Sequence, residues 1–256
     1  MYITSADCAN FKTFKVANKT TNTFELQDVD GNNVNSSAYT TYSSAGVANR
    51  IYQITTEYTT AQLFDLKFAQ SADVMYICHP DHEPMKLSRT GHTSWSLTEV
   101  DFGTNGPYMD TNTTATTLTP ASAGTGTGVN ITASSTTGIN NDQGWLTTDV
   151  GRIIKFNGGE AQITSRTNST VVVCTITDAF ANTDATATFQ LGSFSDTTGF
   201  PSSVSFFEQR LVFAATNDQP QTIFFSKSGD YENMSAGTND DDAMIYTIAS
   251  NQVNAI

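Results

Sequence analysis

The clearest structural pattern in this chain lies between residues 199 and 256, which read GFPSSVSFFEQRLVFAATNDQPQTIFFSKSGDYENMSAGTNDDDAMIYTIASNQVNAI. Aromatic and branched residues gather in short segments at 204–207, 210–214, 222–226 and 244–248, and polar turns separate them. In the last segment Met244, Tyr246 and Ile248 recur at every second position, as on one face of a β-strand. Short strands joined by turns that contain Pro or Gly predict a β-meander, such as a propeller blade or a barrel wall.

The composition of the whole chain favours strands over helices. Charged residues make up only 14 % of the 256 residues, and Thr, Ser and Asn supply most of the polarity. Surface helices usually use Lys, Glu and Arg instead. The formal net charge of −13 argues against binding nucleic acid through its phosphates, which requires clustered Lys and Arg. The same charge suits simple solubility, or a wall that DNA passes without being held.

The cysteine pattern indicates free thiols. Cys8, Cys78 and Cys174 are far apart in the sequence and odd in number, so a disulfide framework is not expected. This fits a protein assembled in a reducing cytoplasm. No stretch approaches the roughly 20 apolar residues of a membrane span.

Pattern shifts divide the chain into four parts. We predict a small β module at 1–49, incomplete at its N-terminus, and the first part of a β platform at 50–112. A Thr/Gly-rich linker and an inserted β module follow at 113–192, and the second part of the platform, expected to continue beyond the C-terminus, spans 193–256. The predicted fold class is therefore all-β. The platform is propeller-like or a meander, is split in sequence, and has small β-barrel or sandwich insertions and one short helix.

Two local predictions can be checked directly. Residues 59–70 have apolar side chains at helical spacing, with Thr60 as a plausible N-cap, so we expect the one helix there. Asn157-Gly158-Gly159 lies between two strand-like segments and predicts a tight hairpin.

Few residues suggest a metal site. Cys78, His79, Asp81 and His82 form the densest cluster of candidate ligands, and His92 lies ten residues further on. They follow one another through a Pro-containing turn, and no second Cys/His pair has zinc-site spacing, so a polar turn is favoured. Asp240–Asp242 is oxygen-rich but lacks the EF-hand spacing, so a solvated loop is favoured and a structural ion remains open.

Catalytic motifs are absent from the sequence. There is no GxSxG, no HExxH and no phosphate-binding glycine loop that opens a helix. Acidic residues are plentiful, but nothing selects a glycosidase pair. Trp95 and Trp145 could stack on sugars, although aromatic residues in strands are more often core. We expect a protein that is not an enzyme and has no cofactor.

Two blocks, 63–108 and 199–234, together resemble the tail nozzle (tail tubular protein B-like) proteins of short-tailed bacteriophages. The resemblance rests on Ser71-Ala72-Asp73, His79-Pro80, Leu87-Ser88-Arg89 and Phe207-Glu208-Gln209-Arg210-Leu211. The flanking sequences around 13–26 and 151–176 are similar to small β-barrel insertions in such proteins.

This resemblance implies a structural virion protein of the phage tail. Copies of the chain would form a ring, a hexamer in that family, around a propeller-like platform. The ring would contact other tail proteins (adaptor, fibres or spikes) and would conduct viral DNA without binding it specifically. No membrane anchor is expected. The architectural positions by this resemblance are Ser71, Asp73, His79, Pro80, Leu87 and Arg89 in the first meander, and Phe207, Arg210 and Leu211 in the second. We expect Arg210, which lies in an apolar run, to pair with a buried carboxylate or carbonyl.

Two alternatives belong to other functional classes. The inserted β modules could bind a host-surface glycan or receptor, with Trp145 as a candidate contact. A tail-associated hydrolase would need a carboxylate pair, which the sequence does not reveal.

Overall fold

The structure is a computed structural model that describes residues 2–5, 13–35, 37 and 48–249. It divides into two compact units, residues 1–57 with 91–94, and residues 58–90 with 95–256. Strands make up nearly all of the regular secondary structure in the described residues. The helical element longer than one residue among them is the 3-10 turn η2 at Thr147–Asp149. The prediction of an all-β fold is confirmed. Within these ranges no helix has the length and hydropathy needed to cross a membrane.

The first unit is built on one antiparallel sheet. Its strands are β1 (Tyr2–Ser5), β2 (Thr13–Ala17), β3 (Glu25–Gln27) and β4 (Ala48–Ile51), in the order β3-β2-β1-β4. Phe14 on β2 is buried, and the turn after β3 is closed by the Asp28 carboxylate, which accepts a hydrogen bond from the Asn32 backbone N–H at 2.8 Å. Because β4 pairs with β1 as far as Ile51, this unit extends past the predicted boundary at residue 49.

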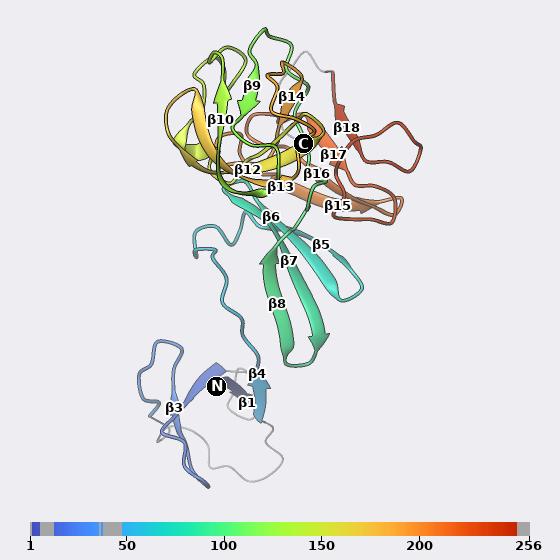
Figure 1. Cartoon of the computed structure of the whole chain (residues 1–256). Coiled ribbons are helices and arrows are strands. Elements are labelled where there is room, and N and C mark those ends of the chain that lie inside the picture. Colours follow the sequence, from blue (N-terminus) through green and yellow to red (C-terminus); the bar gives the residue numbers. More distant parts are fainter. Residues whose placement is uncertain (1, 6–12, 36, 38–47, 250–256) are drawn as a thin grey trace. The chain divides into compact units, whose positions relative to one another are not determined.

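The second unit contains two four-stranded meanders (Figure 1). The first runs in order through β5 (Lys67–Ser71), β6 (Val74–His79), β7 (His82–Gly91) and β8 (Ser94–Glu99). The second runs through β15 (Ser203–Phe207), β16 (Arg210–Ala214), β17 (Thr222–Phe225) and β18 (Met244–Thr247). A platform made of two sequence-separated meanders is therefore present.

A shared core joins the two meanders. Tyr76 and Cys78 of β6 are buried in one cluster with Leu211 and Phe213 of β16 and Phe224 of β17. Phe194, which follows the inserted module in sequence, meets the Phe224 ring edge-on at a centroid distance of 5.1 Å. Such aromatic contacts add to the stabilisation from buried area, so the two sheets form one packed body.

The inserted module is a separate curled sheet. Its strands are β9 (Leu118–Pro120), β10 (Gly126–Ala133), β11 (Ile153–Phe156), β12 (Gly159–Arg166), β13 (Val171–Asp178) and β14 (Phe189–Leu191), in the order β14-β11-β12-β13-β10-β9. Leu118 and Thr186 exchange backbone hydrogen bonds of 2.8 and 3.0 Å, which tie β9 to the segment leading into β14. The sheet therefore curls into a half-barrel, with β14 and β9 as its two end strands. We call this module the inserted barrel.

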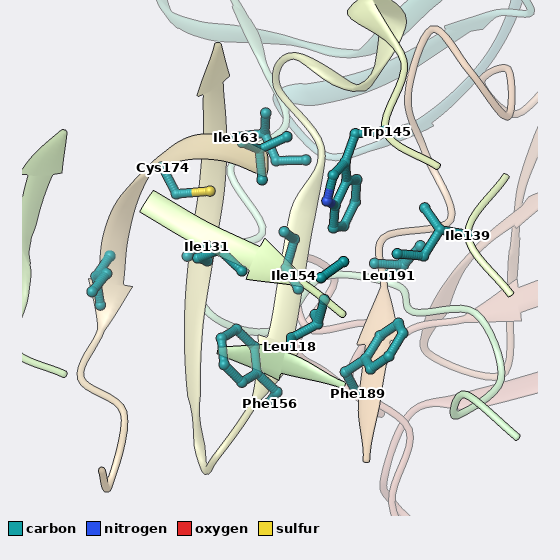
Figure 2. Close-up of a cluster of buried hydrophobic side chains, with 14 of the residues drawn as sticks. Leu118, Ile131, Ile139, Trp145, Ile154, Phe156, Ile163, Cys174, Phe189 and Leu191 are labelled. Carbon is teal, nitrogen blue, oxygen red and sulfur yellow. The ribbon is translucent and has the colours of Figure 1, made fainter. Parts of the chain in front are cut away.

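The inserted barrel has its own apolar core (Figure 2). Leu118, Ile131, Trp145, Ile154 and Cys174 are fully buried in it. Burying a side chain of this size is worth about 1.5–3 kcal/mol, so this core makes a substantial contribution to the stability of the module. The prediction of a small β-barrel insertion agrees with this module.

The predicted helix at 59–70 is wrong. Residues 60–65 form turns, and Lys67–Ser71 pairs with Val74–Cys78 as strand β5. A helix of about three turns is marginal by itself, and pairing with β6 satisfies the same backbone groups within a larger sheet. Of the apolar residues that suggested a helix, Leu63, Phe64 and Phe68 are exposed.

The Thr/Gly-rich stretch after residue 113 is also more than a linker. It contributes β9, with Leu118 fully buried, and begins β10 at Gly126. A single apolar residue was enough to anchor a short strand in the barrel core, which its composition did not indicate.

The predicted hairpin at Asn157-Gly158-Gly159 is confirmed. Phe156 pairs with Gly159 across a two-residue turn in which Asn157 and Gly158 have φ of 46° and 75°. Two positive φ values are the mark of a type I′ turn, for which Asn-Gly is the preferred sequence.

Candidate functional site

Three positions of the resemblance meet at the start of the first meander. Ala72 has φ of 51° in the tight turn between Ser71 and Val74, which are paired across β5 and β6. The Arg89 Nη1 atom lies 3.1 Å from Asp73 Oδ1, and the Arg89 backbone N–H donates to the Asp73 carbonyl at 2.9 Å. Both side chains are partly exposed, so the ion pair stabilises only weakly and the backbone bond fixes the geometry.

The turn between β6 and β7 contains His79 and Pro80. His79 is buried, and its Nδ1 accepts a hydrogen bond from the Asp81 backbone N–H at 3.1 Å. The centroids of the His79 and His82 rings lie 5.2 Å apart. Cys78 faces the platform core, where burial raises the pKa of its thiol. Within the described part of the chain, no three His, Cys, Asp or Glu side chains converge where a metal ion could bind. Leu87 of β7 is partly buried opposite Met75.

Arg210 is held by backbone carbonyls. Its Nη1 donates to the Ser226 carbonyl at 2.7 Å and to the Asp242 carbonyl at 2.6 Å, and its Nη2 donates to the Asp240 carbonyl at 2.7 Å. The side chain is 7 % exposed. The expectation that Arg210 pairs with a buried carboxylate or carbonyl is confirmed, with carbonyls as the partners. Arg210 therefore attaches the acidic loop before β18 to the strand β16.

The hairpin that presents Arg210 is strained. Phe207 pairs with Arg210 across a turn in which Glu208 and Gln209 have φ of 44° and 61°. Non-glycine residues seldom adopt this conformation. Leu211, the next residue, is fully buried in the platform core, whereas Phe207 is exposed. In the motif 207–211, Leu211 is therefore buried in the core, Arg210 binds backbone carbonyls and Phe207 is an aromatic residue on the surface.

Two carboxylates of the acidic loop, those of Asp241 and Asp242, have partners within the chain. Asp242 Oδ2 accepts hydrogen bonds from the Asn239 backbone N–H at 3.0 Å and side-chain amide at 2.9 Å, and these bonds hold the pKa of Asp242 below its usual range. The Lys227 Nζ lies 3.5 Å from Asp241 Oδ2 and 3.7 Å from Asp242 Oδ1. Lys227 thus offsets part of the negative charge of these two carboxylates.

Two groups of exposed apolar residues lie on the platform. Met244, Tyr246 and Ile248 are exposed at alternate positions along and just after β18, while Ile245 between them packs against the core. We call these three residues the β18 row. Leu63, Phe64 and Phe68 form the second group, the β5 group, just before and within β5, and Phe64 is 90 % exposed. Both β18 and β5 are edge strands of their sheets.

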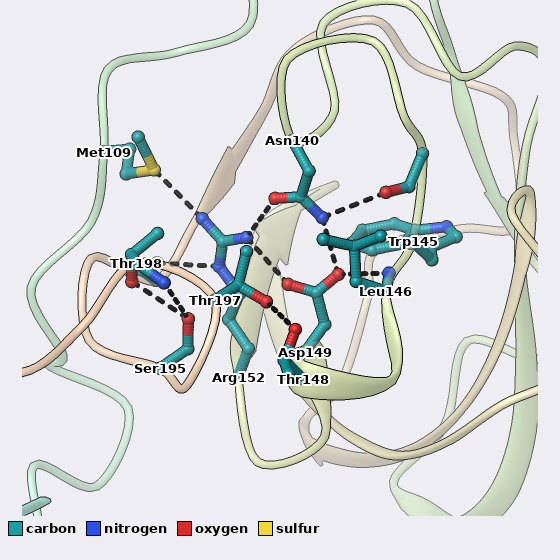
Figure 3. A network of polar contacts seen from close by, with 12 residues as sticks. Met109, Asn140, Trp145, Leu146, Thr148, Asp149, Arg152, Ser195, Thr197 and Thr198 are labelled. Atoms are coloured by element: carbon teal, nitrogen blue, oxygen red, sulfur yellow. Dashed lines mark hydrogen bonds and ion pairs between the residues drawn. The ribbon is translucent and has the colours of Figure 1, made fainter. Parts of the chain in front are cut away.

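A buried polar network surrounds Asp149 and Arg152 in the inserted barrel (Figure 3). Asp149 of η2 is fully buried and its Oδ1 lies 3.0 Å from Arg152 Nη1. The other oxygen of Asp149 accepts hydrogen bonds from Asn140 Nδ2 at 2.6 Å and the Leu146 backbone N–H at 2.7 Å. Arg152 also donates to the Asn140 side-chain oxygen at 2.8 Å and the Gly192 carbonyl at 2.9 Å. Sequence reasoning missed this network, although an Arg directly before Ile153-Ile154 was a usable signal.

Trp145 is not available to a glycan. Its side chain has 0 % exposure and belongs to the core of the inserted barrel (Figures 2 and 3). The interpretation of Trp145 as a glycan contact is therefore wrong. The next residue, Leu146, donates its backbone N–H to the Asp149 carboxylate, so Trp145 lies next in sequence to the polar network.

The described part of the second unit contains several cavities, of which two are candidates for a site. The larger, about 420 Å³, lies between the first meander and the inserted barrel, with Glu83, Glu99, Asp101, Ile153 and Phe200 in its lining. The smaller, about 290 Å³, lies beside the polar network and is lined by Asn140, Arg152 and Asp218 among others. The larger one presents mainly apolar walls with exposed carboxylates, whereas the smaller one gathers amides, hydroxyls and charges.

Glu160 is a second buried acid in the inserted barrel. Its carboxylate accepts hydrogen bonds from the Tyr108 hydroxyl and, at 3.1 Å, from the Thr177 hydroxyl. The loss of water around it raises its pKa, and the two hydrogen bonds offset this only in part. The burial and the neighbouring carboxylate also raise the pKa of Tyr108, which stays a hydrogen-bond donor.

The raised pKa of Glu160 predicts a pH-dependent stability. The folded protein holds the proton of the Glu160 carboxyl more tightly than the unfolded chain does. The contribution of Glu160 to the free energy of unfolding therefore falls as the pH rises from the pKa of the unfolded chain through the pKa of the folded protein. Glu160→Gln keeps a side chain that can bond to Tyr108 and Thr177, and should flatten this part of the profile. The midpoint of urea unfolding, measured at several pH values between acid and neutral, checks this for the wild type and the variant. The same change of midpoint with pH in both proteins would contradict it.

A scan against known protein-family models found no match, and a search of curated proteins found none either.

Proposed function

We propose that this chain is a structural protein of a bacteriophage tail, of the nozzle type, which works by assembling with copies of itself. The observation that carries the proposal is the β18 row. Three apolar side chains are exposed at alternate positions along and just after an edge strand, and Ile245 between them packs against the platform core. Contiguous exposed apolar residues mark surfaces that another protein covers.

A second copy of the chain is the partner that suits this surface best. The β5 group lies on a different sheet, so the β18 row and the β5 group are two distinct apolar surfaces on one chain. A surface that binds a different surface of the next copy generates a ring when the rotation closes. With a formal net charge of −13, copies repel one another at long range, so the association must come from apolar contact.

The sequence resemblance supports the same proposal from another direction. The matching positions lie at ordered points of the two meanders: a backbone hydrogen bond joins Asp73 and Arg89 in one hairpin, and Arg210 ties the acidic loop before β18 to β16. A ring with an acidic wall would let DNA pass without retaining it, because phosphate binding requires clustered cations. The partners expected for such a ring are adjoining tail proteins, and its place is the virion.

Complementation tests this function. In a phage that encodes this chain, a nonsense mutation in its reading frame should give DNA-filled heads that cannot infect. The wild-type chain supplied in trans should restore plaques, and so should Asn130→Asp, which adds a charge at an exposed site on the inserted barrel. Tyr246→Asp should not restore them, because it places a charge in the β18 row. Full infectivity of the nonsense mutant, or full rescue by Tyr246→Asp, would contradict the proposal.

A further inference from the structure

The smaller cavity has features of a site built for a ligand. It measures about 290 Å³ and is lined by the side chains of Asn140, Gln143, Arg152 and Asp218, with Met109 and Leu191 as apolar walls. Its residues come from the inserted barrel and from the segments on either side of it in the sequence. We call it the Asn140 pocket.

One donor in the pocket has only a weak acceptor. Arg152 is 1 % exposed, and its Nη2 contacts the Met109 sulfur at 3.0 Å (Figure 3). A thioether is a poor hydrogen-bond acceptor, and buried guanidinium N–H groups are normally satisfied by oxygen. The Nε and Nη1 atoms of Arg152 already donate to Gly192, Asn140 and Asp149. Nη2 is thus placed to donate to an oxygen that enters the pocket.

The loop that forms one wall is held in a strained conformation. Asn140, Asn141 and Asp142 have φ of 50°, 54° and 68°, a short left-handed turn of non-glycine residues. The Asn140 side chain fixes this turn, because its amide donates to Asp149 at 2.6 Å and to the Gly144 carbonyl at 3.0 Å. Strain of this kind concentrates where a loop is pre-organised for binding.

The charges in the pocket favour a neutral ligand. Asp149 compensates Arg152 directly, and the Asp218 carboxylate adds a second negative charge near the guanidinium. An anion would therefore meet net repulsion. A hydroxyl group can accept from Arg152 and donate to Asp218 at the same time, which neither a carboxylate nor an ammonium ion can do.

We infer that the Asn140 pocket binds one ring of a neutral saccharide. Its volume lies at the lower end of the range for small-molecule sites, which suits a single sugar residue, free or at the end of a chain. The mixture of amide, hydroxyl, carboxylate and guanidinium groups matches the alternating donors and acceptors of a polyol. The site differs from the Trp145 contact that the sequence suggested, and it does not depend on assembly of the chain.

Saturation-transfer NMR of the full chain tests this inference. The probes are neutral hexoses, deoxyhexoses, N-acetylhexosamines and uronic acids. We expect at least one neutral sugar to bind with a dissociation constant on the order of 1 mM, the range expected for small polar ligands. Gln143→Ala and Asp218→Asn alter exposed side chains of the lining, and each should weaken neutral-sugar binding about tenfold. Asn130→Ala, exposed on β10 and outside the lining, should bind like the wild type.

Asp218→Asn also tests the charge argument, because it should narrow the preference for neutral sugars over uronic acids. Binding of no sugar in the panel would overturn the inference. So would unchanged binding in Gln143→Ala, or a wild-type preference for uronic acids.

Discussion

Asp149→Ala is expected to lower the free energy of unfolding of the inserted barrel by about 3–5 kcal/mol, the range for breaking a buried ion pair. Asp149 is fully buried and compensates Arg152 at 3.0 Å. Its loss removes the counter-charge that is hydrogen-bonded to the guanidinium, in a site where burial already lowers the Arg152 pKa. It also removes the acceptor of the Asn140 amide and the Leu146 N–H, so the strained turn at 140–142 loses its support.

Urea unfolding followed by Trp145 fluorescence measures this effect, in a Trp95→Phe background that leaves Trp145 as the reporter. Asp184→Ala, which removes an exposed carboxylate of the same module, is the matched control and should change the stability by less than about 0.5 kcal/mol. The double variant Asp149→Leu/Arg152→Met should be less destabilised than Asp149→Ala, because it leaves no buried charge. A cost below about 1 kcal/mol for Asp149→Ala would show that water reaches the network.

Arg210→Ala is expected to destabilise the platform by about 3 kcal/mol, because hydrogen bonds from a charged group are worth about 1.5–3 kcal/mol each and are not additive. Three carbonyls, of Ser226, Asp240 and Asp242, lose their charged donor. The loop before β18 is then released from β16, so the β18 row should also be less ordered. Arg210→Lys should be intermediate, since an ammonium group cannot match the forked geometry.

Arg89→Ala is the matched control for this prediction. It removes an Arg whose ion pair with Asp73 is partly exposed, and should cost less than about 1 kcal/mol. Thermal unfolding of the three variants gives the comparison. Equal midpoints for Arg210→Ala and Arg89→Ala would mean that the carbonyl clamp does not stabilise the platform.

Local turn chemistry and strand alternation predicted most of the fold. The sequence Asn157-Gly158 predicts a type I′ turn by itself. The alternation of Met244, Tyr246 and Ile248 predicts that the three side chains lie on one face of a strand. Arg210 was predictable because an isolated charge in an apolar run must find a buried partner. In each case the information lies within a few neighbouring residues.

The errors came from pairing and packing that side-chain spacing alone does not reveal. Residues 59–70 have helical spacing, but Lys67–Ser71 pair with β6 in a local hairpin and residues 60–65 form turns. The burial of Trp145 depends on the curl of the inserted barrel, which no local pattern reveals. The Asn140 pocket gathers Met109, Asn140 and Asp218 from three separated segments, so its composition could not be read from any one of them.

The solution mass of the purified chain across a range of concentrations tests the central claim of self-assembly most directly. Sedimentation velocity should show one closed oligomer of defined size, well above the monomer mass of 27.6 kDa, that forms with rising concentration and is lost in Tyr246→Asp but kept in Asn130→Asp. A wild-type chain that sediments as a monomer at every concentration, with the same profile as Tyr246→Asp, would contradict it.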